Sequence, residues 1–229
     1  LFIDAHPYSL TENTSGQTLS LTLAKTADGA GSWVVEPKTI GNETGLRYQD
    51  WVTRKAHYTD SVSNGRIGYV HIPDMGGEGL KQFASTFYPQ IRKEGLIVDV
   101  RWNGGGFVSQ LIIERLRRVL SGLGKSRNFE ETTYPSTVFH GYMACLCNEH
   151  SASDGDNFPH HFREYGLGPV IGKRTWGGVV GIRGHRSFTD GGFMNTPEFA
   201  KYDFDRKWII ENRGVSPDIE VEYPPEIVY

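Results

Sequence analysis

The chain is 229 residues long with a mass of 25.7 kDa, and its 38% hydrophobic residues supply enough apolar material for one sizeable core and a small appendage. Lys and Arg number 24 against 27 Asp and Glu, so the net charge is −3 and no basic run is long enough to follow a phosphate backbone. No stretch approaches the roughly 18 apolar residues of a membrane helix, so we expect neither a nucleic-acid partner nor a membrane span.

The first forty residues predict a β-hairpin. Leu19, Leu21 and Leu23 alternate with polar residues, and a turn-rich stretch at 27–31 leads into the apolar run 33–35. Two strands alone are not independently stable, so we interpret residues 1–40 as the end of a small β domain and 41–65 as a connector. The chain begins at Leu1 rather than Met, and we expect the gene product to start upstream.

From about residue 60 onward, strand and helix patterns alternate. Short apolar runs predict strands at 67–73, 96–100, 142–147 and 169–171, and apolar residues at helical spacing predict helices at 79–93, 108–120 and 157–165. This alternation predicts a layered α/β domain over residues 66–229. Cys145 and Cys147 share one face of the third strand, where we expect two small core side chains rather than a disulfide.

Three consecutive glycines, Gly104, Gly105 and Gly106, follow the second strand and open a helix. A loop of this kind presents bare backbone N–H groups to a phosphate or to an oxyanion. No Gly-Lys-Ser or Gly-Lys-Thr follows, so the loop is not a P-loop.

Small residues also follow the third strand, around Ser153. A serine in a strand-to-helix elbow exposes its hydroxyl, and the N–H of the next residue, Asp154, lies beside it as an oxyanion donor. The alternative is an ordinary helix N-cap, for which Ser and Asp are the preferred residues.

Late in the chain, Glu211 follows the apolar run 208–210, which we expect to be a strand. Its carboxylate is a candidate for the acid of a catalytic site, and the alternative is a surface ion pair with Arg206 or Arg213. The eight histidines show no zinc-ligand spacing, so we expect no metal.

Five segments of this chain, in order, resemble the serine peptidases of the tricorn protease group, which are related to the C-terminal processing peptidases. The segments are GRIGYVHIPDM, GLIVDVRWNGGGFVSQLIIERL, NEHSASDGDNFP, GLGPVIGKRTWGGVVGI and WIIENRGVSPDIEVE, and they cover nearly all of residues 60–222. The resemblance implies a layered α/β core of the ClpP/crotonase-like type. It also implies a preceding PDZ-like domain, of which residues 1–40 would be the C-terminal part.

The resemblance assigns roles to particular residues of this sequence. Ser153 matches the nucleophile, Glu211 matches the acidic residue that completes the charge arrangement around the base, and the N–H of Asp154 matches one oxyanion donor. The second donor comes from the glycine triplet, with Gly105 and Gly106 preferred. The family's catalytic histidine lies upstream of the PDZ-like domain, and is therefore expected upstream of Leu1.

The implied activity is hydrolysis of peptide bonds through an acyl-enzyme on Ser153, without metal or cofactor, by a cytoplasmic homo-oligomer. The substrate would be a peptide or an unfolded polypeptide, entering as an extended strand beside residues 176–180. Two alternatives remain. One is a peptide-binding module without catalysis, and the other is a hydratase-type enzyme that acts on acyl thioesters and forms no covalent intermediate.

Overall fold

The structure is a computed structural model that describes residue 9, residues 11–222 and residue 224. It divides into two compact units between Thr53 and Arg54. In the first unit, β1 (Leu21–Leu23) pairs with β2 (Trp33–Val35) in antiparallel fashion, with Leu21 opposite Val35. This ribbon confirms the hairpin expected from the alternating leucines.

A helix, α2 (Thr44–Val62), occupies most of the segment interpreted only as a connector. Most of its side chains are exposed, and the buried ones among its residues are few: Val52 and Thr59. A helix with so narrow an apolar face gives a weak periodic signal, which explains why the sequence did not predict it.

The second unit is built on a five-stranded parallel sheet in the order β11-β8-β7-β4-β3. The strands are β3 (Ile67–His71), β4 (Gly95–Asp99), β7 (Tyr142–Cys147), β8 (Val170–Gly172) and β11 (Ile219–Glu220). Their order in space follows their order in the chain, and Val98 of β4 lies between Val70 of β3 and Cys145 of β7. The loops that follow β4 and β7 therefore both begin at the carboxyl ends of neighbouring parallel strands. Ligand sites of α/β folds lie at these strand ends.

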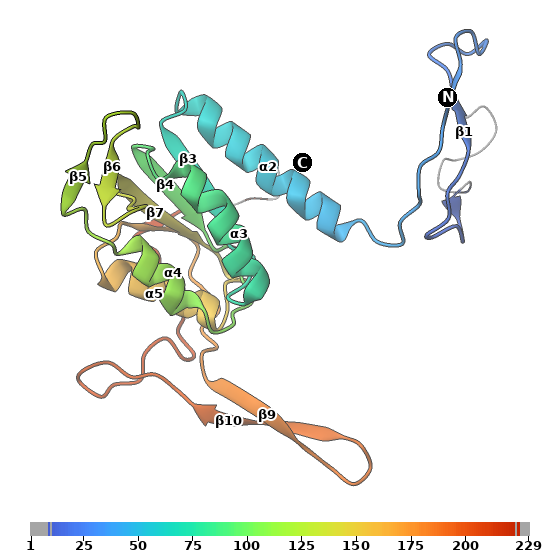
Figure 1. The fold of residues 1–229 in the computed structure, drawn as a ribbon. Helices are drawn as coiled ribbons and strands as arrows, with labels where there is room; N and C mark the ends of the chain where they lie inside the picture. Colours follow the sequence, from blue (N-terminus) through green and yellow to red (C-terminus); the bar gives the residue numbers. More distant parts are fainter. Residues whose placement is uncertain (1–8, 10, 223, 225–229) are drawn as a thin grey trace. The chain divides into compact units, whose positions relative to one another are not determined.

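Three helices connect the strands and share one apolar core with them (Figure 1). They are α3 (Gly77–Phe87), continued by a 3-10 turn at Tyr88–Gln90, α4 (Ser109–Leu116) and α5 (Asp154–Glu164). Phe87, Ile112 and Phe158 bring the three helices into contact with the buried face of the sheet. The layered α/β prediction is confirmed, although α5 begins three residues earlier than the expected start at residue 157.

The two cysteines behave as expected from their spacing. Both are buried in the core and neither forms a disulfide. Burial raises the pKa of the Cys147 thiol to about 12, so it stays protonated and unreactive at neutral pH.

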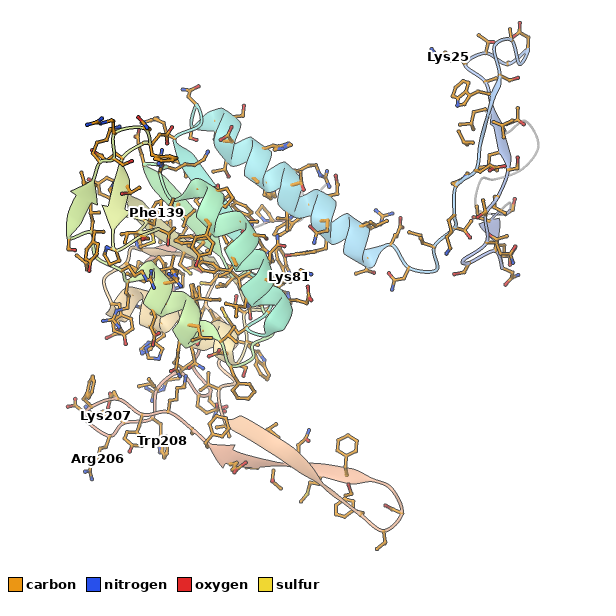
Figure 2. The ribbon with its side chains drawn as sticks, in the orientation of Figure 1. Lys25, Lys81, Phe139, Arg206, Lys207 and Trp208 are labelled. Atoms are coloured by element: carbon orange, nitrogen blue, oxygen red, sulfur yellow. The ribbon has the colours of Figure 1, made fainter. Side chains whose placement is uncertain are left out.

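Two antiparallel ribbons lie outside the five-stranded sheet: β5 (Gly122–Gly124) with β6 (Thr132–Tyr134), and β9 (Gly181–Ser187) with β10 (Phe193–Phe199). The strand expected at 208–210 is wrong. Trp208 makes an isolated bridge with Tyr202 and lies with Arg206 and Lys207 on the loop after β10 (Figure 2). Over the described residues, no helix combines the length and the apolar character required to cross a bilayer.

Candidate active site

Ser153 stands immediately before α5, in a backbone conformation that few residues adopt. Its φ is 56° and its ψ is −118°, and its hydroxyl makes no capping hydrogen bond although it occupies the N-cap position. Such a conformation in a non-glycine residue is strained and is characteristic of a functional elbow. The geometry therefore argues against the ordinary N-cap and leaves the half-buried hydroxyl available for chemistry.

The glycine loop after β4 packs directly against this elbow. A Cβ atom on Gly105 would lie 2.6 Å from the Cβ of Ser153 and 2.9 Å from the amide nitrogen of Asp154. A Cβ atom on Gly106 would lie 2.0 Å from the carbonyl oxygen of Met75. Both positions have positive φ, so glycine is required there by conformation as well as by space.

The amides of the glycine loop differ in what they bind. The N–H of Gly105 donates to the side-chain oxygen of Asn103 at 2.9 Å and is not free for a substrate. The amides of Gly106 and Asp154 have no acceptor within the described part of the chain. Of the two glycines expected as donors, Gly106 is thus the one whose N–H remains available.

Asn103 is a residue that the sequence reasoning missed. It is fully buried, and its side-chain amide donates to the carbonyl of Ile72 at 2.9 Å. Its backbone carbonyl accepts the N–H of Ala152 at 2.8 Å. Asn103 therefore ties the glycine loop both to the end of β3 and to the serine elbow, and its place between a buried strand and a glycine triplet was the available signal.

Asp154 makes a second connection between the two loops. Its carboxylate accepts the N–H of Ser109 at 3.0 Å and the hydroxyl of Ser109 at 2.6 Å. Ser109 is the first residue of α4, so a negative charge lies at the N-terminus of that helix, where it is stabilised. The side chain of Asp154 has this buried structural task, while its amide nitrogen lies beside Gly105 of the glycine loop.

Glu211 lies in the loop that follows β10. One carboxylate oxygen, Oε2, accepts the N–H groups of Val179 and Val180, both at 2.8 Å. These bonds stand in place of the alternative, a surface pair with an arginine, and they fix the carboxylate from one side. The second oxygen, Oε1, meets no donor among the described residues.

The backbone around Glu211 is strained. Ile210 and Asn212, its two neighbours, have φ values of 70° and 59°. Positive φ is rare for any non-glycine residue and especially unfavourable for a β-branched one such as Ile210. Strain of this kind persists where surrounding structure enforces it, here a small cluster in which Ile210 packs with Val179 and Val215.

Most backbone amides of residues 176–180 bind acceptors within the chain. The N–H of Trp176 donates to Ser151, that of Gly177 donates to Asp156, and those of Val179 and Val180 donate to Glu211. The segment that we expect beside an extended substrate therefore has four of its five amides bound within the chain, and the pairing stays a prediction.

The histidines whose side chains the structure describes are not hydrogen-bonded to Ser153. His150 stacks on Trp102 with ring centroids 6.5 Å apart, and the ring of His71 bonds to the carbonyl of Arg101 at 3.0 Å. Ser153 has no hydrogen bond to any imidazole in the part of the chain that the structure describes. That part also contains no group of three or more His, Cys, Asp or Glu side chains suited to hold a metal ion.

Residues 66–221 match the model of peptidase family S41. The chain is 47% identical over 180 residues to the tricorn protease of Thermoplasma acidophilum, an alignment that covers 79% of this chain and 17% of the relative. It is 43% identical over 192 residues to a putative tricorn-like protease C-terminal subunit of Sulfurisphaera tokodaii, covering 84% of this chain and 22% of the relative. The chain thus spans about a fifth of the length of these relatives.

Solved structures agree with these matches. A crystal structure of the tricorn protease superposes with a TM-score of 0.88 at 40% identity, over 95% of this chain and 21% of that one. The photosystem II D1 C-terminal processing protease shares the fold at a TM-score of 0.51 and 18% identity, over 91% of this chain and 56% of that one. Together with the family match over most of its length, these likenesses establish that the chain belongs to peptidase family S41.

Proposed function

We propose that this chain carries the nucleophile and the oxyanion hole of a serine peptidase that cleaves peptides or unfolded polypeptides. The observation that carries the proposal is the conformation of Ser153, uncapped at positive φ and packed against Gly105. An elbow of this kind holds a hydroxyl clear of its own helix and places the following amide beside it.

In the proposed reaction, the Ser153 oxygen attacks the scissile carbonyl carbon as its proton passes to a histidine. The carbonyl oxygen becomes an oxyanion, held by the amides of Asp154 and Gly106. The tetrahedral intermediate collapses as the proton moves to the leaving amine, and the acyl-enzyme is then hydrolysed by water. The family resemblance assigns the histidine to a part of the gene product upstream of residue 1.

Glu211 is proposed as the acid that orients this base arrangement. Its Oε2 is fixed by two backbone amides, so Oε1 presents a fixed charge toward an incoming donor. A preorganised carboxylate of this kind stabilises the imidazolium that forms when Ser153 loses its proton.

We also propose that residues 1–40 are the C-terminal part of a PDZ-like domain, that residues 41–65 connect it to the peptidase core at 66–229, and that the protein works as a homo-oligomer. The antiparallel pairing of β1 and β2 supports the first part. The 0.88 superposition, which extends over 95% of this chain, supports the order of the parts. The oligomer rests on the resemblance alone.

The proposed function is tested by treating the complete gene product with a serine-reactive phosphonate and mapping the adduct by mass spectrometry. We expect a single adduct on Ser153, and Ser153→Ala should abolish both labelling and peptide hydrolysis, with Ser85→Ala as the exposed-serine control. Peptide binding without an adduct would favour the peptide-binding module. A Ser153→Ala variant that keeps full activity on an acyl thioester would favour the hydratase.

A further inference from the structure

Asp156, on the first turn of α5, is a fully buried carboxylate that has no part in the chemistry proposed above. Taking a carboxylate out of water costs several kcal/mol unless partners compensate. Its Oδ1 accepts the N–H of Gly177 at 2.8 Å, and its Oδ2 is buried without a hydrogen-bond partner in the described residues.

The segment that Asp156 holds is the one that binds Glu211. Gly177 precedes Val179 and Val180 by two and three residues, and those amides fix Oε2 of Glu211. The carbonyl of Gly177 also accepts the N–H of Asn212, the residue after Glu211, at 2.7 Å. Gly177 therefore connects α5, which its N–H contacts at Asp156, to the Glu211 loop, which its carbonyl contacts at Asn212.

The loop that contains Gly177 is also bonded to the segment that leads into the serine elbow. The N–H of Trp176 donates to the carbonyl of Ser151 at 3.0 Å, two residues before Ser153. A Cβ atom on Gly177 would lie 2.4 Å from the amide nitrogen of Gly214, so the two loops interleave too closely for any larger residue. Asp156 thus lies three residues after Ser153 and hydrogen-bonds directly to the loop whose amides bind Glu211.

The groups that shift the pKa of Asp156 belong to the same segments. Burial raises the pKa of Asp156, and the nearby charge of Glu211 raises it further. The Thr175 hydroxyl and the amides of Gly177 and Ser153 act in the opposite direction and favour the charged form. The carboxylate is therefore in electrostatic contact with the nucleophile's own backbone and with Glu211.

We propose that Asp156 is a positioning residue that couples the nucleophile elbow to Glu211 by clamping residues 175–180 between them. The proposal rests on the proposed function of Ser153 and Glu211. It predicts that Asp156 acts on the rate of the chemical step through the placement of Glu211, and not on substrate affinity.

The test compares Asp156→Ala, Asp156→Asn, Glu211→Ala and the double variant Asp156→Ala with Glu211→Ala in the complete gene product. We expect kcat of Asp156→Ala to fall about 10- to 100-fold with little change in KM, because small misplacements of catalytic groups cost rates of that order. The double variant should be no slower than Glu211→Ala, because residues acting as a unit are not additive. Asp156→Asn keeps an acceptor for Gly177 and should recover part of the rate.

Asp218→Ala is the matched control. Asp218 also accepts a backbone amide, that of Val170 at 2.8 Å at the start of β8, and it pairs with Arg163 in the last turn of α5 rather than with the Glu211 loop. It should lower stability and leave kcat unchanged.

Amide hydrogen exchange gives a readout independent of turnover: residues 177–180 should exchange faster in Asp156→Ala. Unchanged protection of these amides, a kcat equal to that of the unmodified protein, or fully additive losses would overturn the role of Asp156. Absence of a phosphonate adduct on Ser153 in the unmodified protein would instead overturn the proposed function.

Discussion

The carboxylate of Asp154 accepts both the amide and the hydroxyl of Ser109, at 3.0 and 2.6 Å, and so joins the first turn of α5 to the first turn of α4. One of these helices follows the serine elbow and the other follows the glycine loop. The contact between Asp154 and Ser109 therefore fixes the relative position of the two amides proposed to hold the oxyanion, those of Asp154 and Gly106.

Removing this contact should affect both stability and rate. Asp154→Ala loses both hydrogen bonds from Ser109 and a longer one from the side-chain amide of Asn157, and we expect the free energy of unfolding to fall by about 3 kcal/mol. Ser109→Ala keeps the backbone bond and loses only the hydroxyl, so its loss should be about 1 kcal/mol. Denaturant unfolding measures both values, and kcat should fall in the same order. Equal losses in the two variants would contradict the paired contact.

The glycine triplet offers a test in which three adjacent substitutions have different outcomes. Gly104→Ala meets nothing within 4 Å and should leave folding and activity nearly unchanged. Gly106→Ala would place its Cβ 2.0 Å from Met75 at a φ of 146°, and we expect a stability loss of about 3 kcal/mol or more.

Gly105→Ala is the informative case, because its Cβ would press on Ser153 itself at 2.6 Å. We expect a folded protein whose phosphonate labelling rate is about 100-fold lower, since the serine and the oxyanion donors are displaced together. Circular dichroism confirms folding and mass spectrometry follows the adduct. Normal labelling of this variant would show that Gly105 does not pack against the nucleophile.

Asn103→Asp tests the connection among the two loops and β3. Asp lacks the N–H donor that reaches Ile72 and introduces a charge at a fully buried position. We expect the free energy of unfolding to fall by about 3 kcal/mol at pH 7 and to recover partly on acidification, because protonation removes the buried charge. A loss that does not depend on pH would point to packing alone.

His161 on α5 gives a prediction about pH and stability. Burial, together with the neighbouring charges of His160 and Lys201, lowers the pKa of His161 to about 4, against the opposing influence of Asp154 and Glu164. Between pH 6.5 and about 4 the folded state therefore binds fewer protons than the unfolded state, so stability falls as the pH falls through this window. Denaturant unfolding of His161→Gln should show a weaker loss over the same range. An unchanged pH profile would mean that His161 titrates normally in the folded state.

Much of the core was predictable because its signals are local. The strand at 142–147 was predicted with the bounds it has, since a buried parallel strand is a continuous apolar run between polar loops. Ser153 and the glycine triplet were found because glycine clusters and small residues at strand ends mark places where backbone must approach closely. The elbow's conformation and the free amide of Gly106 are consistent with that interpretation.

The parts that were missed depend on contacts distant in sequence. Trp208, Ile209 and Ile210 have the composition of a strand, yet Ile210 is held at positive φ by packing against Val179 and Val215. The choice between Gly105 and Gly106 is an exception: it depends on a local bond, which the N–H of Gly105 donates to the side chain of Asn103 two residues earlier and which no periodicity reports. The proposed role of Asp156 depends on Gly177, 21 residues further on, and local patterns carry no information about such a pairing.

The chain leaves the site at Val180 and returns to it at Glu211, and these two residues are joined by a 2.8 Å hydrogen bond. The residues between them, including the β9–β10 ribbon, form one long loop whose two ends are joined by this hydrogen bond. The entropy cost of closing such a loop grows only slowly with its length. The turn at residues 188–192, between β9 and β10, is therefore where residues can be added or removed, whether by evolution or by an engineer inserting a reporter domain, while the packing of Ile210 and the geometry of the acid stay the same.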